Sequence, residues 1–289
     1  MAHATRRLLA AVARSSPGFR GKVRLLRKAD ALLRASDAGP LEHDVRGVRY
    51  ALATEDIIDF NLLYAGGYQS SLVRYLADTL ATGAPVLWDV GANVGSVSLP
   101  VAAAAPGVRI HSFEPSPAVH RRLLRNLSLN PGLAGHIHPH AIALADTDGD
   151  ATFYESNQPF NSGVGGFGRS GNQVSSAVRV AAARGDTLIQ RGEIPAPSLL
   201  KIDVEGFEGE VLRGLTSTLG TGRVEVIFEH CPYRMRERGM PLRAHCDLLT
   251  SLGYALWFME PGPVPLDRLA RQLTPRDLEG DCDIIARKT

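Results

Sequence analysis

The chain has 289 residues, of which 44% are hydrophobic and 21% charged, a balance that fits a globular protein built around one large domain. Its formal net charge of +2 excludes a bulk electrostatic drive toward nucleic acid or a membrane. The apolar run Leu8–Ala13 is closed by Arg14 and is too short for a membrane span or for the core of a signal peptide. Three widely spaced cysteines form no zinc or disulfide pattern, which favours a reduced, cytoplasmic protein.

The first 43 residues predict a basic helical arm ahead of a main domain that spans residues 44–289. Nine Arg and Lys residues are interspersed among apolar residues up to Arg34, in a pattern typical of amphipathic helices. The segment Ser15–Gly18 interrupts this pattern and predicts two short helices. Such a segment could lie on an anionic membrane surface, or it could pack on the domain or on a sister subunit. A peripheral contact at the inner membrane surface and a homo-oligomer therefore both stay open.

Residues 44–80 predict a hairpin at the edge of the domain and then a helix over Ser71–Leu80. Alternation over Val45–Tyr50 is typical of a strand. The segment Tyr64–Ser70 is a polar and aromatic turn that directly precedes the helix. Because it lies just upstream of the glycine loop described next, we expect it to act as a lid over a ligand.

The segment Pro85–Val97, PVLWDVGANVGSV, predicts a buried strand, a tight loop and the start of a helix. The loop positions that we expect to hold a nucleoside-containing cofactor are Asp89, Gly91, Asn93 and Gly95. A dinucleotide fingerprint, G-x-G-x-x-G, would need glycine at positions 93 and 96, which hold Asn93 and Ser96. The spacing Asp-x-Gly-x-Asn-x-Gly resembles instead the first motif of class I S-adenosylmethionine-dependent methyltransferases, although a plain strand-to-helix turn can also use glycine.

Strands and helices alternate from this loop onward. The rhythm predicts an α/β fold with a doubly wound, mostly parallel, seven-stranded Rossmann-like sheet whose last two strands pair antiparallel. The expected strands are 86–90, 109–113, 136–144, 199–204, 224–229, 254–259 and 282–286, and the expected helices are 96–105, 117–129, 206–219 and 242–252. Residues 146–180 interrupt the rhythm and predict a β-hairpin insertion with a mobile loop over Asn157–Gly171, which serves as a substrate cover or as a plain surface excursion.

The end of the second predicted strand offers a partner for the cofactor's ribose. Glu114 lies 19 residues after Gly95 and is followed by Pro115 and Ser116. An acid at this point can accept both ribose hydroxyls, although an acid at a helix start is also favoured by the helix dipole. Asp146, after the third strand, would lie near the adenine edge, but it is equally suited to a turn.

The stretch Leu199–Glu208 ends a strand with two acids. Asp203 and Glu205 would share one side of the strand, about 6–7 Å apart. Carboxylates there are costly unless they are solvated, paired or functional, and Lys201 could pair with one of them.

These acids and the end of the next strand supply candidates for catalysis. A base that takes a proton from an alcohol would come from Asp203, Glu205, Glu229 or His230. The three acids could instead collect Mg²⁺, but none of them needs a metal to be explained, so we predict no metal site.

Three stretches together resemble the FkbM-type family of class I S-adenosylmethionine-dependent methyltransferases. They are DVGANVGSVSL, FEPSPAVHRRLLRNLSLN and LLKIDVEGFEGEVLRGL. The resemblance covers about residues 60–230, and Phe207 stands where the family more often has a small residue. It implies S-adenosyl-L-methionine as the cofactor and O-methyl transfer to a hydroxyl of a small acceptor, either a sugar, a glycolipid or a polyketide-type natural product.

Two other classes of function remain as alternatives. The chain could be an N-methyltransferase acting on a macromolecule, but it has no clustered basic patch in its core and no Asn/Asp-Pro-Pro-Tyr motif, so we expect no nucleic-acid partner. It could also be a non-catalytic protein that binds a membrane or a partner through its basic arm. The intact glycine loop and Glu114 argue against that reading.

Overall fold

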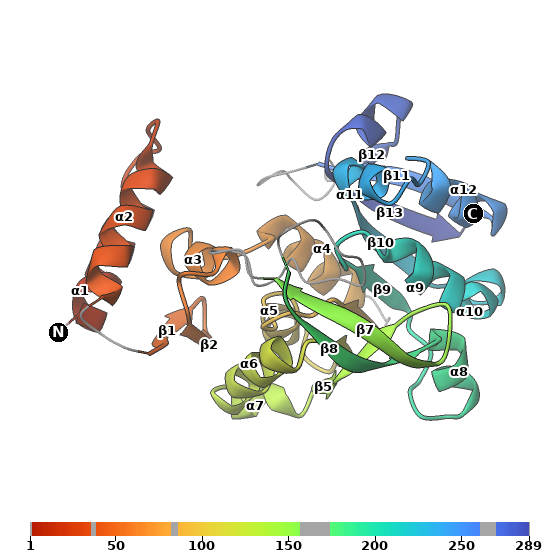
Figure 1. Cartoon of the computed structure of the whole chain (residues 1–289), viewed down its shortest axis with the longest axis horizontal. Coiled ribbons are helices and arrows are strands. Elements are labelled where there is room, and N and C mark those ends of the chain that lie inside the picture. The colour runs from red at the N-terminus through yellow and green to blue at the C-terminus, as the bar shows by residue number, and fades with distance from the viewer. Residues whose placement is uncertain (1, 36–38, 82–85, 157–173, 261–269, 289) are drawn as a thin grey trace.

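The computed structural model describes residues 2–35, 39–81, 86–156, 174–260 and 270–288. The predicted arm is present as two helices, α1 (Ala2–Ser15) and α2 (Lys22–Arg34). The arm stands at one end of the molecule, and the closing strands of the main sheet lie at the other (Figure 1). Within these described ranges, no helix combines the length and the apolar character needed to cross a membrane.

The main sheet has eight strands in the described part of the chain, one more than predicted. Their order across the sheet is β12 (Ala270–Gln272), β11 (Tyr254–Met259), β13 (Cys282–Lys288), β10 (Glu225–His230), β9 (Leu199–Ile202), β3 (Val86–Val90), β4 (Arg109–Phe113) and β5 (Ile137–His140). The five strands from β10 to β5 run parallel. β13 pairs antiparallel with both β10 and β11, which confirms the predicted final pair, and β12 adds the eighth strand at the edge.

Helices cover both faces of this sheet. Successive strand residues point to opposite sides, so the buried strands present apolar side chains to a helical layer on each face. Leu87 packs in one hydrophobic cluster and its neighbour Trp88 in the other, and Leu199 and Leu200 divide in the same way. The first cluster includes α4 (Ser70–Ala81), α5 (Ser98–Ala104) and α6 (Pro117–Ser128); the second includes α8 (Gly185–Gln190), α9 (Glu208–Gly214), α10 (Thr216–Thr221) and α12 (Ala244–Ser251). The fold is therefore doubly wound and Rossmann-like, as predicted.

The predicted single strand over 136–144 is wrong, because the chain changes sheets at Ala141. β5 pairs with β4, whereas β6 (Ile142–Leu144) pairs with Ala181–Ala183 of the insertion. The insertion itself is the predicted hairpin, formed by β7 (Gly149–Ser156) and β8 (Val174–Ala183). Its loop, Asn157–Gly171, lies outside the described residues.

The predicted amino-terminal hairpin forms a small sheet of its own instead of an edge of the main one. β1 (Leu41–Val45) and β2 (Val48–Leu52) are joined by Arg46 and Gly47, whose φ angles of 54° and 86° are those of a tight hairpin turn. The remaining helices are α3 (Ile57–Tyr64), α7 (Pro131–Ala134), α11 (Pro232–Glu237) and the 3₁₀ segment η3 (Pro275–Glu279).

The winding of the chain creates a crevice between β3 and β9. From β3 the chain builds outward to β4 and β5, and it then returns to β9 on the other side of β3. The loops that follow β3 and β9 diverge at such a reversal, and ligands of open α/β sheets bind there, beyond the carboxyl ends of the strands. The glycine loop, Glu114 and the two acids after β9 all lie at this edge.

Candidate active site

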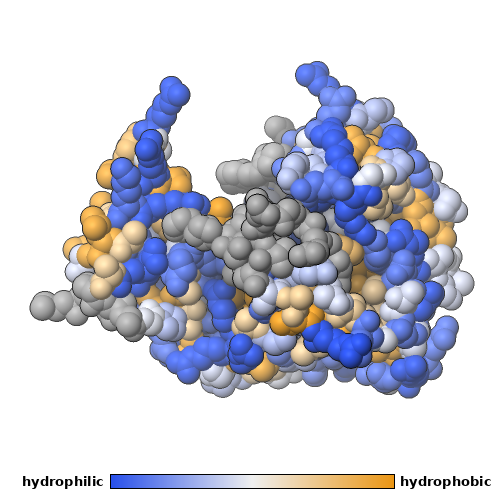
Figure 2. Space-filling model, viewed as in Figure 1, coloured by the Kyte–Doolittle hydropathy of each residue, from blue (hydrophilic) through white to orange (hydrophobic). Residues whose placement is uncertain are grey.

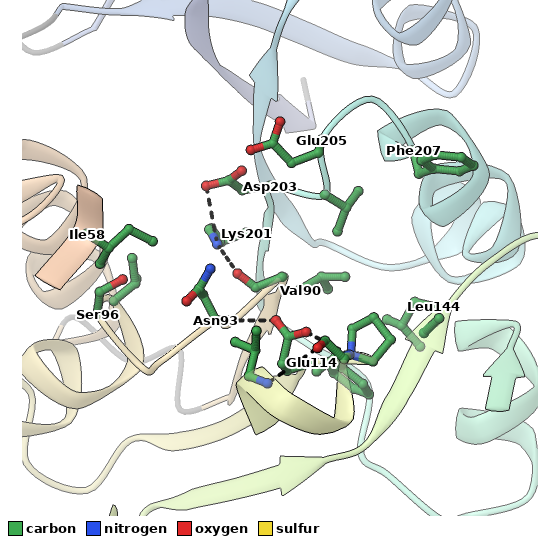
Figure 3. A pocket seen from close by; sticks show the side chains of 18 of the residues that line it. Ile58, Val90, Asn93, Ser96, Glu114, Leu144, Lys201, Asp203, Glu205 and Phe207 are labelled. Atoms are coloured by element: carbon green, nitrogen blue, oxygen red, sulfur yellow. Dashed lines mark hydrogen bonds and ion pairs between the residues drawn. The ribbon is translucent and has the colours of Figure 1, made fainter. Parts of the chain in front are cut away.

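A cavity of about 250 Å³ opens at the carboxyl ends of β3, β4 and β9. Most of the predicted site residues line it: Gly91, Asn93, Glu114, Pro115, Ser116, Asp203 and Glu205. Figure 3 shows Glu114 and Asn93 together on one side of the cavity, with Lys201, Asp203 and Glu205 in a row beyond them. Tyr68 and Gln69, from the predicted lid segment, also line it.

Gly91 brings the loop after β3 into direct contact with the chain after β9. Its φ is 77°, and a Cβ atom at this position would lie 1.8 Å from the carbonyl oxygen of Asp203. Its own carbonyl oxygen accepts a hydrogen bond of 3.0 Å from Lys201 Nζ. Asn93 also has a positive φ, of 50°, and its Oδ1 accepts from the amide of Val94 at 2.8 Å. The loop therefore needs glycine at 91 for both its conformation and its close approach.

Asp89 and Gly95 support this loop from behind and do not line the cavity. Asp89 is fully buried; its Oδ2 accepts from Ser98 Oγ at 2.5 Å and its Oδ1 lies 3.0 Å from Lys201 Nζ. At Gly95, with a φ of 83°, a Cβ atom would lie 2.8 Å from the Leu123 side chain. Both residues shape the loop. Of the four loop positions predicted to hold the cofactor, Gly91 and Asn93 line the cavity, whereas Asp89 and Gly95 support the loop.

Glu114 is buried and is held at both carboxylate oxygens. Oε2 accepts from the amide of Asn93 at 3.1 Å, and Oε1 accepts from the amide of Ser116 at 2.9 Å. Burial raises the pKa of Glu114 to about 7, against the lowering effect of these two amides. Each carboxylate oxygen can accept a second hydrogen bond, so the group can still receive a pair of hydroxyls.

The two acids after β9 lie in a loop and not within a strand, because β9 already ends at Ile202. Asp203 Oδ2 accepts from Gln69 Nε2 at 3.3 Å, and Glu205 Oε2 lies 3.4 Å from Arg234 Nε. Glu205 has a φ of 55°, a strained value for a residue with a side chain. Burial and the charge of Asp203 raise its pKa to about 7.

Glu208 holds this strained loop, a role that the sequence reasoning missed. Its Oε1 accepts from the amide of Val204 at 3.2 Å and from the amide of Gly206 at 3.1 Å. The signal was present in the sequence, since an acid a few residues after a strand end and at the start of a helix commonly binds free backbone amides. Glu208 therefore acts as a positioning residue for Asp203 and Glu205.

Lys201 connects the two motifs and was predicted only as a partner for one of the acids. Its side chain is 3% exposed, and its Nζ lies 3.0 Å from Asp89 and 3.7 Å from Asp203. Burial lowers the pKa of Lys201, but the two carboxylates outweigh this effect and raise it to about 12. The residue is thus a permanent cation between the loops after β3 and β9.

A second, larger cleft of about 1040 Å³ adjoins the cavity and shares Tyr68, Gln69 and Ser96 with it. Glu229 and Asp283 line this cleft and stand directly opposite each other on β10 and β13. The charge of Asp203, together with burial, raises the pKa of Glu229 far above its ordinary value. The cleft therefore presents a concentration of carboxyl groups beside the cavity.

His230 and Asp146 lie outside both the cavity and this cleft. Glu229 and His230 are adjacent on β10 and point to opposite faces of the sheet, so only Glu229 reaches the cleft. His230 is fully buried, with Nε2 3.0 Å from the carbonyl oxygen of Leu278. Asp146 lies 3.1 Å from Arg213 Nε, on α9. Among the residues that the structure describes, no three His, Cys, Asp or Glu side chains are grouped to hold a metal ion.

The doubly wound sheet, the glycine loop after its first strand, the acid after its second and the acids after its fourth define a class I methyltransferase. Residues 89–256 match the sequence profile described as the Methyltransferase FkbM domain. The chain belongs to this family, and it is a methyltransferase that uses S-adenosylmethionine.

The chain is similar to proteins that are named as methyltransferases. It is 28% identical over 209 residues to the Hexuronic acid methyltransferase AglP of Haloferax volcanii, covering 72% of this chain and 82% of that protein. It is 30% identical over 157 residues to the 31-O-demethyl-FK506 methyltransferase FkbM of Streptomyces tacrolimicus, covering 45% and 59%. Among solved structures, the FkbM methyltransferase of Methylobacillus flagellatus matches with a TM-score of 0.46 and 15% identity, over 70% of this chain and 43% of that one.

Proposed function

We propose that this methyltransferase transfers its methyl group to a hydroxyl oxygen of a small acceptor, and that the cavity beside Gly91 and Glu114 holds the cofactor. The observation that carries the proposal is the meeting of three loops, after β3, β4 and β9, around one cavity. The bound cofactor supplies an electrophilic methyl group on a positively charged sulfur. The residues of this chain bind it, orient the acceptor and take up the hydroxyl proton.

The residues around the cavity fit this cofactor. The absence of a side chain at Gly91 leaves room for close backbone approach, and the lone pairs left on Glu114 suit the two hydroxyls of a ribose. Asp203 lies at the far side of the cavity, where a carboxylate would attract the positive charges at the methionine end of the cofactor. Pro115 and Ser116 complete the lining near Glu114.

The base that we propose is Glu205, with Asp203 as its neighbour. A pKa of about 7 suits a group that must be ionised to accept a proton and must hold it afterwards. The Glu205 carboxylate would take up the hydroxyl proton as the acceptor oxygen receives the methyl group that the bound cofactor supplies. His230, which is buried against Leu278, has no part in this proposal.

The acceptor would enter through the cleft that contains Glu229 and Asp283, because this cleft shares lining residues with the cavity. Glu229 keeps its proton in the folded protein, so the charge of the cleft comes from its other lining residues. Four further acids outnumber two arginines there, which disfavours an anionic acceptor relative to a neutral or amine-bearing one; they are Asp78, Glu260, Asp281 and Asp283 against Arg46 and Arg74. We therefore propose a neutral or amino sugar, a glycolipid with such a head group, or a polyketide-type alcohol. The Haloferax relative is named for a hexuronic acid, and we propose that this chain differs from it in acceptor charge.

Two measurements test the proposal. Calorimetry with S-adenosylmethionine should detect binding to the wild-type chain, and absence of binding would overturn the assignment of the cavity. Release of S-adenosylhomocysteine should then be followed with a hexose, a hexosamine and a hexuronate at equal concentrations. Turnover with the hexuronate above that with the other two would overturn the proposed acceptor charge.

Variants separate the proposed roles. Glu205→Gln should lower kcat roughly 10²- to 10⁴-fold while the cofactor affinity stays within threefold, since a general base contributes to the chemical step. Asp203→Asn should abolish turnover and also weaken cofactor binding. His230→Gln is the matched control and should keep turnover; its loss in a folded variant would return His230 to the site. A cytoplasmic location and self-association remain proposals without a role in this scheme.

A further inference from the structure

The amino-terminal arm gathers the positive charge of the chain. Residues 1–35 contain nine of the 32 Lys and Arg residues but only one of the 30 acids, Asp30, so they carry a formal charge of +8. Because the whole chain carries +2, residues 36–289 carry −6. A compositional bias toward arginine would add positive charge along the whole chain. It therefore does not explain why residues 1–35 are positive while residues 36–289 are negative.

The single acid of residues 1–35, which contain α1 and α2, is used internally. Asp30 is 1% exposed and accepts from Arg6 Nε at 3.0 Å, from Arg34 Nε at 2.9 Å and from Tyr64 Oη at 2.8 Å. Thr54 Oγ1 also donates to it, at 2.6 Å. This buried cluster ties α2 to α1 and to the domain, so the arm has a defined position on the body and turns no carboxylate of its own to solvent.

The arm exposes several large apolar side chains to solvent. Of the eight large hydrophobic side chains that are exposed in the described part of the chain, six lie in the arm: Leu8, Val12, Phe19, Val23, Leu25 and Leu32. Leu32 is 77% exposed, the highest value among them. Isolated apolar side chains are normal on a surface, but a concentration of this kind marks an interaction site. Figure 2 shows hydrophobic and hydrophilic residues side by side on the arm.

A shallow hollow on α2 places apolar and basic groups together. Phe19 and Val23 line it, with Arg24 and Lys28 beside them. Arg24 and Lys28 are exposed, and within the described ranges neither makes a hydrogen bond or ion pair with another side chain. A surface with both kinds of group and no exposed acid is complementary to lipids that carry a negative head group above apolar chains.

We propose that the arm, comprising α1 and α2, docks this methyltransferase on the surface of an anionic lipid bilayer. Leu25 and Leu32, seven residues apart on α2, would enter the boundary between head groups and acyl chains. Arg20, Arg24 and Lys28 would contact the lipid phosphates. A nucleic acid would use the basic groups and leave the six apolar side chains in water, so a bilayer accounts for both sets of residues.

The test is co-sedimentation of the full-length chain with phospholipid vesicles. We expect binding to phosphatidylcholine vesicles that contain about 30% phosphatidylglycerol, no binding to pure phosphatidylcholine, and release at about 0.5 M salt. The triple variant Arg20→Glu, Arg24→Glu and Lys28→Glu should weaken binding at least about a hundredfold, since each basic residue contributes about fivefold. The double variant Leu25→Ser and Leu32→Ser, which leaves the net charge unchanged, should weaken vesicle binding roughly tenfold or more.

A matched control carries the same change of charge on the body of the protein. Arg179, Arg191 and Arg243 are exposed there, and their replacement by Glu should weaken vesicle binding much less than the arm variant. Equal losses, or no binding of the wild type to anionic vesicles, would overturn the proposal. So would tighter binding to duplex DNA than to vesicles at the same salt, or an arm variant that changes the oligomeric state in light scattering. All arm variants should keep the wild-type affinity for S-adenosylmethionine, which separates this test from that of the proposed function.

Discussion

A side chain at Gly91 and the carbonyl oxygen of Asp203 cannot occupy the molecule together, because a Cβ atom at position 91 would lie 1.8 Å from that oxygen. The contact joins the loop after β3 to the loop after β9, the two halves of the crevice. Lys201 Nζ reinforces the junction, at 3.0 Å from the carbonyl oxygen of Gly91.

Gly91→Ala should separate the two loops. We expect a loss of well over 2 kcal/mol in the free energy of unfolding, since the backbone must move as well as adopt a positive φ. Urea unfolding measures the loss, and calorimetry should show that the variant no longer binds S-adenosylmethionine. Gly107→Ala is the control, because Gly107 has a φ of 90° with no atom within 4 Å of an added Cβ. It should cost about 1–2 kcal/mol and leave cofactor binding intact; equal effects of the two variants would refute the steric explanation.

Lys201→Met should destabilise the protein by about 3–5 kcal/mol, because it leaves the buried carboxylate of Asp89 without its cation. Chemical denaturation measures this, and adding Asp89→Asn to the same chain should recover part of the loss. Lys288→Met provides the comparison, since Lys288 donates to the backbone carbonyls of Gly220 and Leu252 near the surface and lies over the ring of Tyr254. It should cost about 1 kcal/mol. A double variant no more stable than Lys201→Met would contradict the pairing.

Glu114→Ala should weaken S-adenosylmethionine binding roughly 10- to 100-fold, because it removes the acceptor for two hydroxyls and the partner of the Asn93 and Ser116 amides. Isothermal titration calorimetry gives the affinities directly. Asp146→Asn should leave the affinity within threefold, since Asp146 pairs with Arg213 and does not line the cavity. If Asp146→Asn were the more damaging change, the adenine end would lie nearer to Asp146 than the cavity suggests.

Glu229→Gln should stabilise the protein more at pH 8 than at pH 5. The charge of Asp203 and burial raise the pKa of Glu229 above its ordinary value of 4.5. The folded protein then retains a proton that the unfolded chain releases, so this carboxyl makes folding less favourable as the pH rises above about 4.5. Glutamine cannot ionise and removes that loss.

Thermal unfolding at the two pH values measures the difference. The surface change Glu193→Gln should shift the melting temperature by less than about 2 °C at both pH values, because Glu193 is half-exposed. A gain for Glu229→Gln that is equal at pH 5 and pH 8 would mean that the pKa of Glu229 is not raised in the folded protein.

Local sequence patterns predicted the positions of the strands better than they predicted which strands pair with one another. The segments 86–90 and 109–113 are found as β3 and β4 with the predicted bounds. In β3 the apolar run Val86–Trp88 gives the continuous signal of a buried parallel strand. The run 136–144 also read as one strand, yet it divides between two sheets at Ala141. Which neighbour a strand pairs with depends on residues far along the chain, here Ala181–Ala183, and no local periodicity reports it.

The sequence by itself determined the glycine loop, the acid after the second strand and the acids after the fourth, because each needs particular residue types at short spacing. Only the tertiary structure decided which of them face the cavity. Alternation along β10 sends Glu229 to the cleft and His230 into the interior, and winding of the chain back to β9 sets Lys201 between Asp89 and Asp203. The position of Lys201 arises from the packing of two strands more than 100 residues apart in sequence, because a buried charge is placed by what surrounds it in space.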